Sequence, residues 1–596
     1  MCGIFGIITK NEQLLGPILI DAAKKLSYRG YDSVGCATLM KDGQILLKKD
    51  VGKVDEVAPK LKFKDMRGSR GIVQLRWATF GVPSQENSQP HIDSTGTMVG
   101  AHNGNVVNNI ELRQQFIDEG MIVRSNNDGE SCVHAVERYI RLGYDIIDAI
   151  RRSYNDLMGD YSFVIGVSGD EKLYASKKGS GLVAGFTEGA TCVSSDLPSI
   201  LPITNKILSI KDGEIVILQA DKIELRSVTN GEIIERQFEI ITENMESAQK
   251  GGFAHFMLKE IHEQPQVARE LIHLLDNSKN VYLMADRLMN ARHIYLIGCG
   301  TSYHACTLGS YYMATLSGRP AFPILAPQFI PQYGSTLSAD DVGIFVSQSG
   351  ETKDVLNALS IAQNMGMQIF GLVNVIGSSR MKLSELYLPL TCGYEISVPA
   401  TKTYSNQVIS FLYLATIMGK HKTMDLNNLP GSIERTISTA EEQLNNLASI
   451  LDSWKDMYIL GYGSTYPVAL EGALKLKEIT DIHAEGLLST EFKHGPLAAV
   501  REGYPIIFIA GSNDIPLIIS GIIEVACRGA KTIVVGEENP WLRSNASTLI
   551  TIPIADSIYN PILAIIPLQL LAYHLSIVRG FDPDYPRNLS KTLTVD

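Results

Sequence analysis

Cys2 stands directly behind the initiator methionine, where its thiol could act as a nucleophile. A small residue at the second position favours removal of Met1, which would leave the thiol beside a free α-amino group. The pKa of such an amine, ~7.7–8.0, suits a general base at neutral pH, and a nucleophile activated by its own terminal amine is a recognised arrangement. While Met1 remains, the Cys2 nitrogen is an amide and the thiol lacks this base. A cysteine of no catalytic consequence is the alternative, so the surrounding motifs must decide.

A second group of residues could move protons. Glu471, Lys475 and Glu478 are spaced i, i+4, i+7 and therefore share one face of a helix. A carboxylate beside a lysine in a cleft can transfer a proton between adjacent carbons of a sugar. His494 follows shortly after. A salt-bridge ladder facing solvent is the alternative interpretation of the same spacing.

A third feature is the hydroxyl-rich segment SQSGET at 347–352, between an apolar strand at 342–346 and a helix at 354–363. Three hydroxyls, an amide and the free N–H groups of a helix N-terminus make a neutral cradle that suits a phosphate. Serines that only cap the helix are the alternative.

The pattern of strands and helices that must position these residues differs between two parts of the chain. Residues 1–240 alternate short strands with a few helices, which predicts an α+β domain rich in antiparallel strands. Residues 241–255 turn polar and glycine-containing, as a linker does. Residues 256–596 alternate apolar strands with helices of 12–18 residues, which predicts parallel βαβ units. This part of the chain ends in an irregular tail, 581–596.

An internal repeat divides this second part. HIYLIGCGTSYHACTLG (293–309) aligns with DMYILGYGSTYPVALEG (456–472) at a constant offset of 163. Each copy is a strand, a glycine turn and a helix, so we expect two similar α/β lobes, 285–425 and 450–580.

Composition excludes several classes of protein. The 596 residues carry a net charge of −11 with no basic run, which disfavours nucleic-acid binding. Eight cysteines are scattered without a CxxC pair, and the histidines show no ligand spacing, so we expect neither a metal nor another cofactor. No signal peptide is apparent. The apolar stretch 560–578 contains Gln569 and His574, which favours a buried core helix over a membrane span, and we expect a cytoplasmic protein.

Five ordered motifs in the first part carry a resemblance. They are CGIFG (2–6), YRGYDSVG (28–35), LRWATFG (75–81), HNGNVVN (102–108) and NDGE (127–130). Together they resemble the N-terminal-cysteine glutamine amidotransferase domain, over about residues 1–240. The resemblance implies that Cys2 attacks the side-chain amide of glutamine, while Asn103 and the Gly104 N–H form the oxyanion hole.

The same resemblance implies how glutamine is held. Arg76 would bind its carboxylate, Asp128 its ammonium group, and Thr79 would complete this pocket. Trp77 matches a residue that gates ammonia passage in one branch of the family. Three positions depart from the family pattern, and we expect them to affect glutamine affinity and coupling rather than the chemistry: Gln74, Phe80 and Gly129.

The second part resembles sugar isomerase (SIS) domains. SQSGET is accompanied by CGTS (299–302), NVIGSS (374–379) and TKTYSNQ (401–407). With the tail included, the whole chain resembles the glucosamine-6-phosphate synthase family. The implied phosphate- and sugar-binding residues are Ser302, Ser347, Gln348, Ser349, Thr352, Val398 and Glu471.

That resemblance also implies the chemistry at the sugar. Lys591 would form an imine with fructose 6-phosphate, and Glu478 would shuttle the proton between C1 and C2, supported by Lys475 and Glu471. His494 would assist ring opening from the neighbouring subunit, which implies a homodimer. The tail would close over the sugar and line a channel for ammonia.

Alternatives remain at two points. Ala400 and the pair Pro327-Gln328 replace residues that lie near the sugar in the family, which leaves another sugar phosphate open as acceptor. A sugar-phosphate sensor without catalysis is the alternative from another class. Amidophosphoribosyltransferase is disfavoured, because Tyr573-His574-Leu575 stand where paired acidic residues should precede SIVRG.

Overall fold

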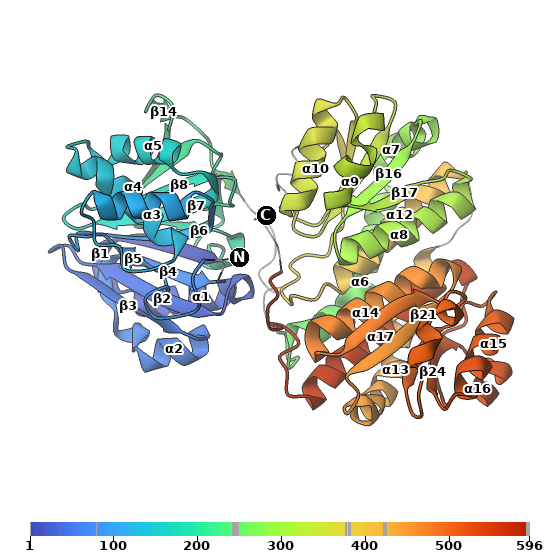
Figure 1. Cartoon of the computed structure of the whole chain (residues 1–596). Coiled ribbons are helices and arrows are strands. Elements are labelled where there is room, and N and C mark those ends of the chain that lie inside the picture. Colours follow the sequence, from blue (N-terminus) through green and yellow to red (C-terminus); the bar gives the residue numbers. More distant parts are fainter. Residues whose placement is uncertain are drawn as a thin grey trace. The chain divides into compact units, whose positions relative to one another are not determined.

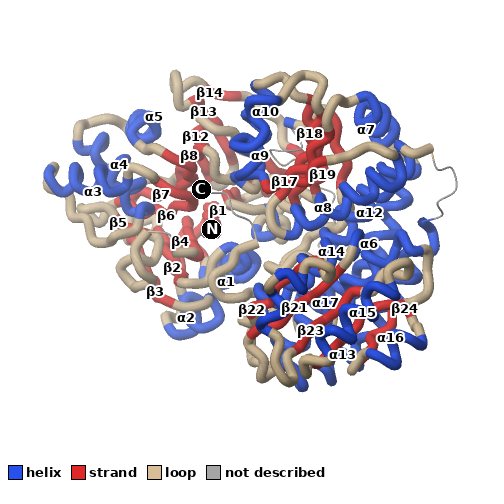
Figure 2. Tube along the Cα trace, turned by 45° about the vertical axis from the view of Figure 1, so that its right-hand side comes forward, coloured by secondary structure: helices blue, strands red, loops and turns tan. Residues whose placement is uncertain are grey.

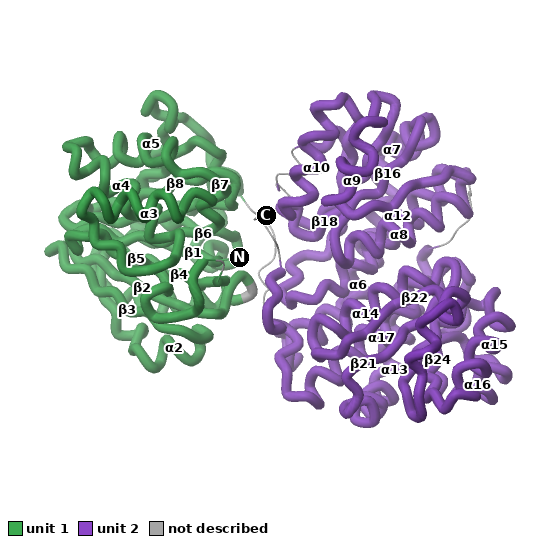
Figure 3. Tube along the Cα trace, viewed as in Figure 1, with its two compact units in different colours: residues 1–248, 592–596 green, residues 249–591 purple. Residues whose placement is uncertain are grey.

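The computed structural model describes residues 2–78, 80–240, 250–375, 378, 383–420 and 426–591. These fall into two compact units, one within residues 1–248 and one within 249–591 (Figure 1, Figure 3). Of the expected linker, 241–249 lie outside the described residues, as do Thr79 and the end of the tail, 592–596.

Unit 1 contains two antiparallel sheets. Sheet A has the order β15 (Glu239–Ile240), β11 (Lys206–Ser209), β9 (Val183–Thr187), β10 (Ala190–Ser194), β1 (Gly3–Leu14), β4 (Arg67–Arg76), β2 (Ser33–Leu39), β3 (Ile45–Val51). Sheet B has the order β14 (Ile233–Ile234), β13 (Lys222–Ser227), β12 (Glu214–Gln219), β8 (Leu173–Lys178), β7 (Gly159–Val167), β6 (Met98–Val106), β5 (His91–Ile92).

The two sheets pack face to face through side chains such as Ile4 and Ile72 of sheet A and Val164 and Val216 of sheet B. Two helices cover the outer face of sheet A: α1 (Gly16–Leu26) and α2 (Val54–Lys60). Three cover the outer face of sheet B: α3 (Asn109–Asp118), α4 (Asp128–Arg141) and α5 (Ile146–Asp156). Inner strands are buried on both faces, as in residues 3–9 of β1 and 161–166 of β7.

Unit 2 contains two parallel sheets of five strands with the same topology (Figure 2). Sheet C has the order β17 (Phe322–Leu325), β16 (Ile294–Gly298), β18 (Val342–Ser347), β19 (Gln368–Val373), β20 (Leu386–Pro389). Sheet D has the order β22 (His483–Leu488), β21 (Asp456–Gly461), β23 (Pro505–Ile509), β24 (Lys531–Glu537), β25 (Thr548–Ile552). The predicted fold class, an antiparallel α+β domain followed by two parallel α/β lobes, is confirmed.

The helices of unit 2 follow the strands in the alternation that the sequence predicts. They are α6 (Phe256–Asp276), α7 (Lys279–Asn290), α8 (Thr301–Tyr312), α9 (Ala326–Tyr333), α10 (Lys353–Asn364), α12 (Lys402–Met418), α13 (Leu429–Leu451), α14 (Tyr466–Thr480), α15 (Ile515–Ala526), α16 (Pro540–Asn545) and α17 (Asn560–Val578). The repeat maps β16 and α8 onto β21 and α14.

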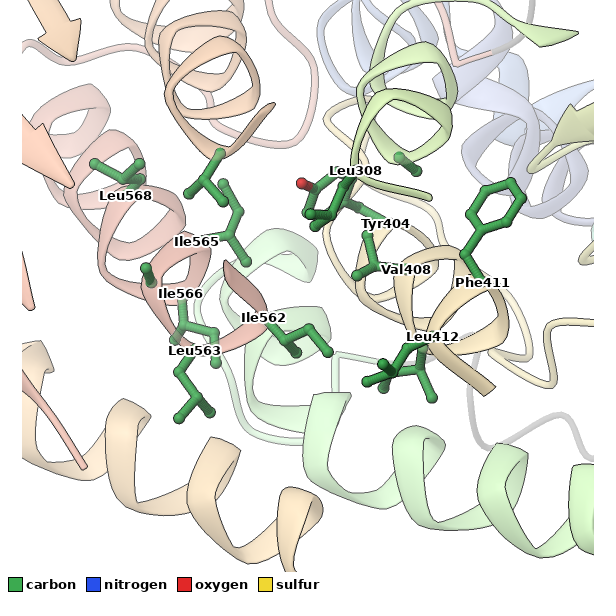
Figure 4. Packing of buried hydrophobic residues seen from close by; sticks show 14 of the residues in the cluster. Leu308, Tyr404, Val408, Phe411, Leu412, Ile562, Leu563, Ile565, Ile566 and Leu568 are labelled. Atoms are coloured by element: carbon green, nitrogen blue, oxygen red, sulfur yellow. The ribbon is translucent and has the colours of Figure 1, made fainter. Parts of the chain in front are cut away.

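A single hydrophobic core joins the two lobes of unit 2. It includes the inner faces of sheets C and D and the helices between them, with side chains of α12 opposite side chains of α17 (Figure 4). Ser557–Val578 is long and apolar enough to cross a membrane, but 83% of its most apolar window is buried inside the protein. Its apolar surface is therefore used in the core, as the polar residues within it suggested.

Residues 581–591 of the tail make specific contacts with the rest of unit 2, although their sequence shows no regular pattern. The Asp584 side chain is 1% exposed and accepts the N–H groups of Phe256 and Met257 at 2.9 and 2.8 Å, at the first turn of α6. Its own carbonyl accepts the N–H of Val398 at 2.9 Å. A carboxylate at a helix N-terminus is stabilising, so the chain from 581 to 591 is held against unit 2.

The repeated glycines Gly309 and Gly472 give a test of this packing. A Cβ atom on Gly309 would lie 2.6 Å from the ring of buried Phe411 on α12. We expect Gly309→Ala to lower the free energy of unfolding by about 1–3 kcal/mol, as overpacking does. Gly431 lies on α13, where no atom would be closer than 3.6 Å to an added Cβ, so Gly431→Ala should be neutral or stabilising. Urea unfolding measures the stability of both variants. Equal stability of the two variants would contradict the tight contact.

Candidate active site

The Cys2 thiol lies at one end of the inner strands of sheet A, where β1 begins beside the end of β4. Its Sγ accepts the N–H of Trp77 at 3.4 Å and lies 3.6 Å from the Trp77 carbonyl oxygen. The side chain is 7% exposed, and burial raises the pKa of the thiol. Arg76 and Asp128 both act electrostatically on this pKa, so the structure brings three of the predicted residues together.

Arg76 is fully buried and organises the loop that follows it. Its guanidinium donates hydrogen bonds to the carbonyl oxygens of Phe80, Gly81 and Val82, the latter two at 2.7 and 3.5 Å. The loop containing position 79 is therefore tied to the strand that carries Arg76. Thr79 itself lies outside the described residues, and binding of a carboxylate by Arg76 stays a prediction.

Asn103 and Gly104 lie on β6, in the sheet that faces β1. The Asn103 side chain has no exposed surface, and neither its Oδ1 nor its Nδ2 has a hydrogen-bond partner among the described residues. Gly104 has φ +111°, and a Cβ there would lie 2.0 Å from the Asp160 carbonyl oxygen, so only glycine fits. Asp128 accepts the N–H of Val106 on the same strand at 3.0 Å.

Two of the departures from the family pattern have a structural explanation. Gln74 donates to the His102 carbonyl oxygen at 3.3 Å, next to Asn103. A Cβ on Gly129 would lie 2.6 Å from Oε1 of Gln89, which itself accepts the His102 N–H at 2.7 Å. Gln89 thus occupies the space that a hydroxyl residue at 129 would need.

Trp77 stacks edge-on against Tyr31, with ring centroids 5.8 Å apart.

In unit 2, the SQSGET loop joins β18 to α10. The Ser347 hydroxyl accepts the Gly350 N–H at 3.1 Å and lies 3.1 Å from the hydroxyl of Thr352, the residue before α10. The Ser349 hydroxyl accepts the Glu351 N–H at 3.2 Å. Gln348 is half-buried beside them. The loop is thus held by its own hydroxyl groups at a helix N-terminus, and phosphate binding there stays a prediction.

Glu471 and Lys475 have no exposed side-chain surface, so their helix face is not a solvent-facing ladder. Lys475 Nζ lies 3.3 Å from Glu471 Oε1 and 2.7 Å from Glu478 Oε2. The Glu471 carboxylate also accepts from the hydroxyl of Thr301 at 3.0 Å and lies 2.7 Å from Nδ1 of His304. Because these two residues belong to α8, the cluster ties the first lobe to the second.

Glu478 is the member of this cluster suited to proton transfer. Burial raises the pKa of its carboxyl group, and the nearby Lys475 only partly opposes that effect. A carboxyl group with a raised pKa exchanges protons more readily near neutral pH than an ordinary one. Lys591 also lowers the Glu478 pKa, which places the tail lysine within electrostatic range of the cluster.

Lys591 makes one short ion pair in the described structure. Its Nζ donates to Oε2 of Glu395 at 2.6 Å, and both side chains are almost completely buried. Ser302, another predicted residue, accepts from the amide of Gln407 at 3.0 Å. His494 ends a short 3₁₀ helix, Phe492–His494, with its side chain exposed. Its role across a dimer interface stays a prediction.

Comparison with known proteins now gives the family. The glutamine amidotransferase domain family matches residues 74–202, and the SIS domain family matches 287–417 and 450–579. Glutamine–fructose-6-phosphate aminotransferase (isomerizing) of Methanothermobacter thermautotrophicus is 40% identical, with all of both chains covered. The enzyme of the same name from Aquifex aeolicus is 39% identical over the same full coverage. The chain belongs to this aminotransferase family.

A solved structure agrees with this assignment for unit 2. The C-terminal domain of the Francisella tularensis glucosamine-fructose-6-phosphate aminotransferase is 28% identical with a TM-score of 0.52. It covers 57% of this chain, and all of that domain is covered.

Sequence reasoning missed two residues of this family member's site. Glu395 and His304 contact Lys591 and Glu471 across 196 and 167 positions of sequence. His304 could have been noticed because it follows CGTS on the same helix turn, whereas nothing in GYEIS singles out Glu395. Among the described residues, no group of three histidine, cysteine or acidic side chains could hold a metal ion.

Lys475 provides a test of the buried cluster. Lys475→Met should lower the free energy of unfolding by about 3–5 kcal/mol, because it leaves Glu471 and Glu478 buried without their cation. Lys477→Met, an exposed lysine on the same helix, should change it by less than about 0.5 kcal/mol. Urea unfolding followed by circular dichroism compares the two, and similar midpoints would sink the buried-charge argument.

Proposed function

We propose that this enzyme transfers the amide nitrogen of glutamine to fructose 6-phosphate, giving glucosamine 6-phosphate and glutamate. This reaction would supply the first step toward nucleotide-linked amino sugars. The observation that carries the proposal is the presence in one chain of both sites. Unit 1 has a buried thiol and, on the facing sheet, a buried amide without a partner among the described residues. Unit 2 has a Glu–Lys–Glu cluster within electrostatic range of the tail lysine. The full-length relatives bear the name of this reaction.

In unit 1, Cys2 attacks the amide carbon of glutamine once its own α-amino group is free to accept the thiol proton. The oxygen that gains charge needs donors already in place, and the Asn103 Nδ2 group and the Gly104 N–H supply them. Arg76 and Asp128 receive the carboxylate and ammonium groups of the substrate. Ammonia leaves, and water releases glutamate from the thioester.

In unit 2, the SQSGET loop and Ser302 hold the sugar phosphate. Lys591 forms an imine with the C2 carbonyl, and Glu478 moves a proton between C1 and C2 during isomerisation. Lys475 keeps Glu478 oriented and balances its charge. His494 assists ring opening from the other subunit of a homodimer, which fits its exposed position.

The first experiment supplies glutamine to the purified enzyme with and without fructose 6-phosphate and quantifies glutamate and glucosamine 6-phosphate together. We expect equal amounts of both products and a sharp rise in glutamate release when the sugar is present. Glutamate without amino sugar would point to a different acceptor, in keeping with Gln328 and Ala400. Sugar-phosphate binding without any glutamate would indicate a sensor.

Cys2→Ala should abolish glutamine hydrolysis and amino-sugar synthesis, because the nucleophile is gone. Conversion of fructose 6-phosphate to the aldose phosphate should remain, because it uses only residues of unit 2. Cys527→Ser, which removes an exposed thiol, is the control and should leave both activities intact. Loss of both activities in Cys2→Ala would contradict two separable sites.

Asn103→Ala tests the oxyanion hole. We expect the kcat of glutamine hydrolysis to fall about 10²–10³-fold, since one donor to the developing charge is lost. The melting temperature should barely change, because the Asn103 amide makes no hydrogen bond to the described residues that its removal would break. A large fall in melting temperature together with normal kcat would show a structural amide instead.

A further inference from the structure

Around Lys591 lies a cluster of buried charges that the proposed chemistry does not yet use. Glu395 and Glu260 are 5% and 2% exposed, and Lys402 is 1% exposed. Lys402 pairs with Glu263 at 2.7 Å, whereas Lys591 pairs with Glu395 at 2.6 Å. Burying so many charges is costly unless each is matched, so the arrangement calls for an explanation.

The Glu395 carboxylate accepts hydrogen bonds from three donors besides Lys591. Its Oε1 accepts the N–H groups of Thr401 and Thr403 at 3.0 and 3.1 Å, at the start of α12. Its Oε2 accepts the Thr403 hydroxyl at 2.7 Å as well as the Lys591 ammonium. Three fixed donors orient the carboxylate, and Oε2 is the oxygen turned toward the lysine.

We propose that Glu395 is the residue that positions Lys591 and accepts its proton when the imine with the sugar forms. The inference rests on the proposed role of Lys591 as the imine-forming residue. An ammonium group has no lone pair, so the lysine must lose a proton before it can attack a carbonyl carbon. Among the described residues, Glu395 Oε2 is the carboxylate oxygen within hydrogen-bond distance of Nζ.

The step balances. The Lys591 ammonium passes a proton to Glu395, and the neutral amine adds to the C2 carbonyl carbon to form a carbinolamine. A second hydrogen moves from nitrogen to the former carbonyl oxygen, and Glu395 returns its proton to that hydroxyl, which leaves as water. The iminium keeps the third ammonium hydrogen, and Glu395 ends as a carboxylate, so charge and atoms are conserved.

Neighbouring groups are arranged so that Glu395 stays charged. Burial raises the Glu395 pKa, but Lys591 and the donors at Thr401 and Thr403 more than reverse this and lower it overall. Burial beside Glu395 raises the pKa of Glu260 to about 8. Glu260 therefore keeps its proton below that pH, which avoids two adjacent buried carboxylates. Cys392 interacts electrostatically with both members of the pair, and Glu478 interacts with Lys591. Lys402 and Glu263 form the neighbouring ion pair of the cluster.

Glu395→Gln tests the proposal, because glutamine keeps an oxygen for the two N–H donors, while its amide nitrogen can neither take a proton nor pair with the Lys591 ammonium. Borohydride trapping of the imine with fructose 6-phosphate, followed by mass analysis of the peptide containing Lys591, measures its formation. We expect the trapping rate at pH 7 to fall about 10²–10⁴-fold. Glu260→Gln is the matched control, since Glu260 lies in the same cluster and, among the described residues, accepts its hydrogen bonds from the backbone N–H groups of Ile396 and Ser397. It should stay within threefold of the natural enzyme.

The pH profile separates proton transfer from a structural role. In Glu395→Gln solvent hydroxide must take the proton in place of the carboxylate, so the trapping rate should rise steeply with pH. The natural enzyme should show little change across neutral pH, because Glu395 carries the proton. A rate lowered equally at every pH, or an unchanged rate, would overturn the proposal.

Lys591→Met tests the premise that this lysine forms the imine, and the thermal unfolding curve of each variant reports whether unit 2 is folded. If Lys591→Met still yields a trapped sugar adduct, the imine role of Lys591 is wrong. If that adduct is lost while Glu395→Gln traps at the natural rate, the role of Lys591 stands and that of Glu395 fails. The two failures are therefore distinguishable.

Discussion

The buried ammonium of Lys475 constrains the isomerase half of the molecule more than any other single group. An ammonium without exposed surface is stable only if carboxylates are brought to it, and Glu471 and Glu478 meet this need from the same helix. Glu471 is in turn fixed by Thr301 and His304 of the first lobe. The orientation of Glu478, the residue that we propose transfers the proton, therefore depends on how the two lobes pack, and the common hydrophobic core holds that packing in place.

In unit 1, too, one buried side chain fixes the backbone while another is left without a partner among the described residues. Arg76 satisfies three loop carbonyls and so fixes the chain next to Cys2, whereas the Asn103 amide is left without a partner among the described residues. An unpaired buried amide is costly, and such groups persist where a ligand or a transition state supplies the missing partner. This contrast, rather than burial alone, supports the proposed role of Asn103 in the oxyanion hole.

Much of this could be read from the sequence, and the remainder could not for definite reasons. The repeat at an offset of 163 and the alternation of strands and helices are local patterns, and they predicted two parallel lobes correctly. The spacing of Glu471, Lys475 and Glu478 shows that they share a helix face, but only packing against α8 decides that the face is buried. Glu395 and His304 were missed because their partners are distant in sequence. The tail looked irregular because its order comes from contacts with unit 2, not from its own periodicity.

Those contacts explain how a tail segment without secondary structure can hold in place the lysine that we propose reacts with the sugar. Asp584 fixes it to the start of α6, and the Lys591–Glu395 pair fixes its far end near the start of α12. In our proposal this pair is an ammonium and a carboxylate at rest, an amine and a carboxylic acid during attack, and an iminium and a carboxylate afterwards. Its net charge is zero at each stage, so the interior never has to accommodate an unmatched charge. Because the pair stays neutral throughout, the step that joins the sugar to the tail avoids the desolvation cost that an isolated buried lysine or glutamate would impose.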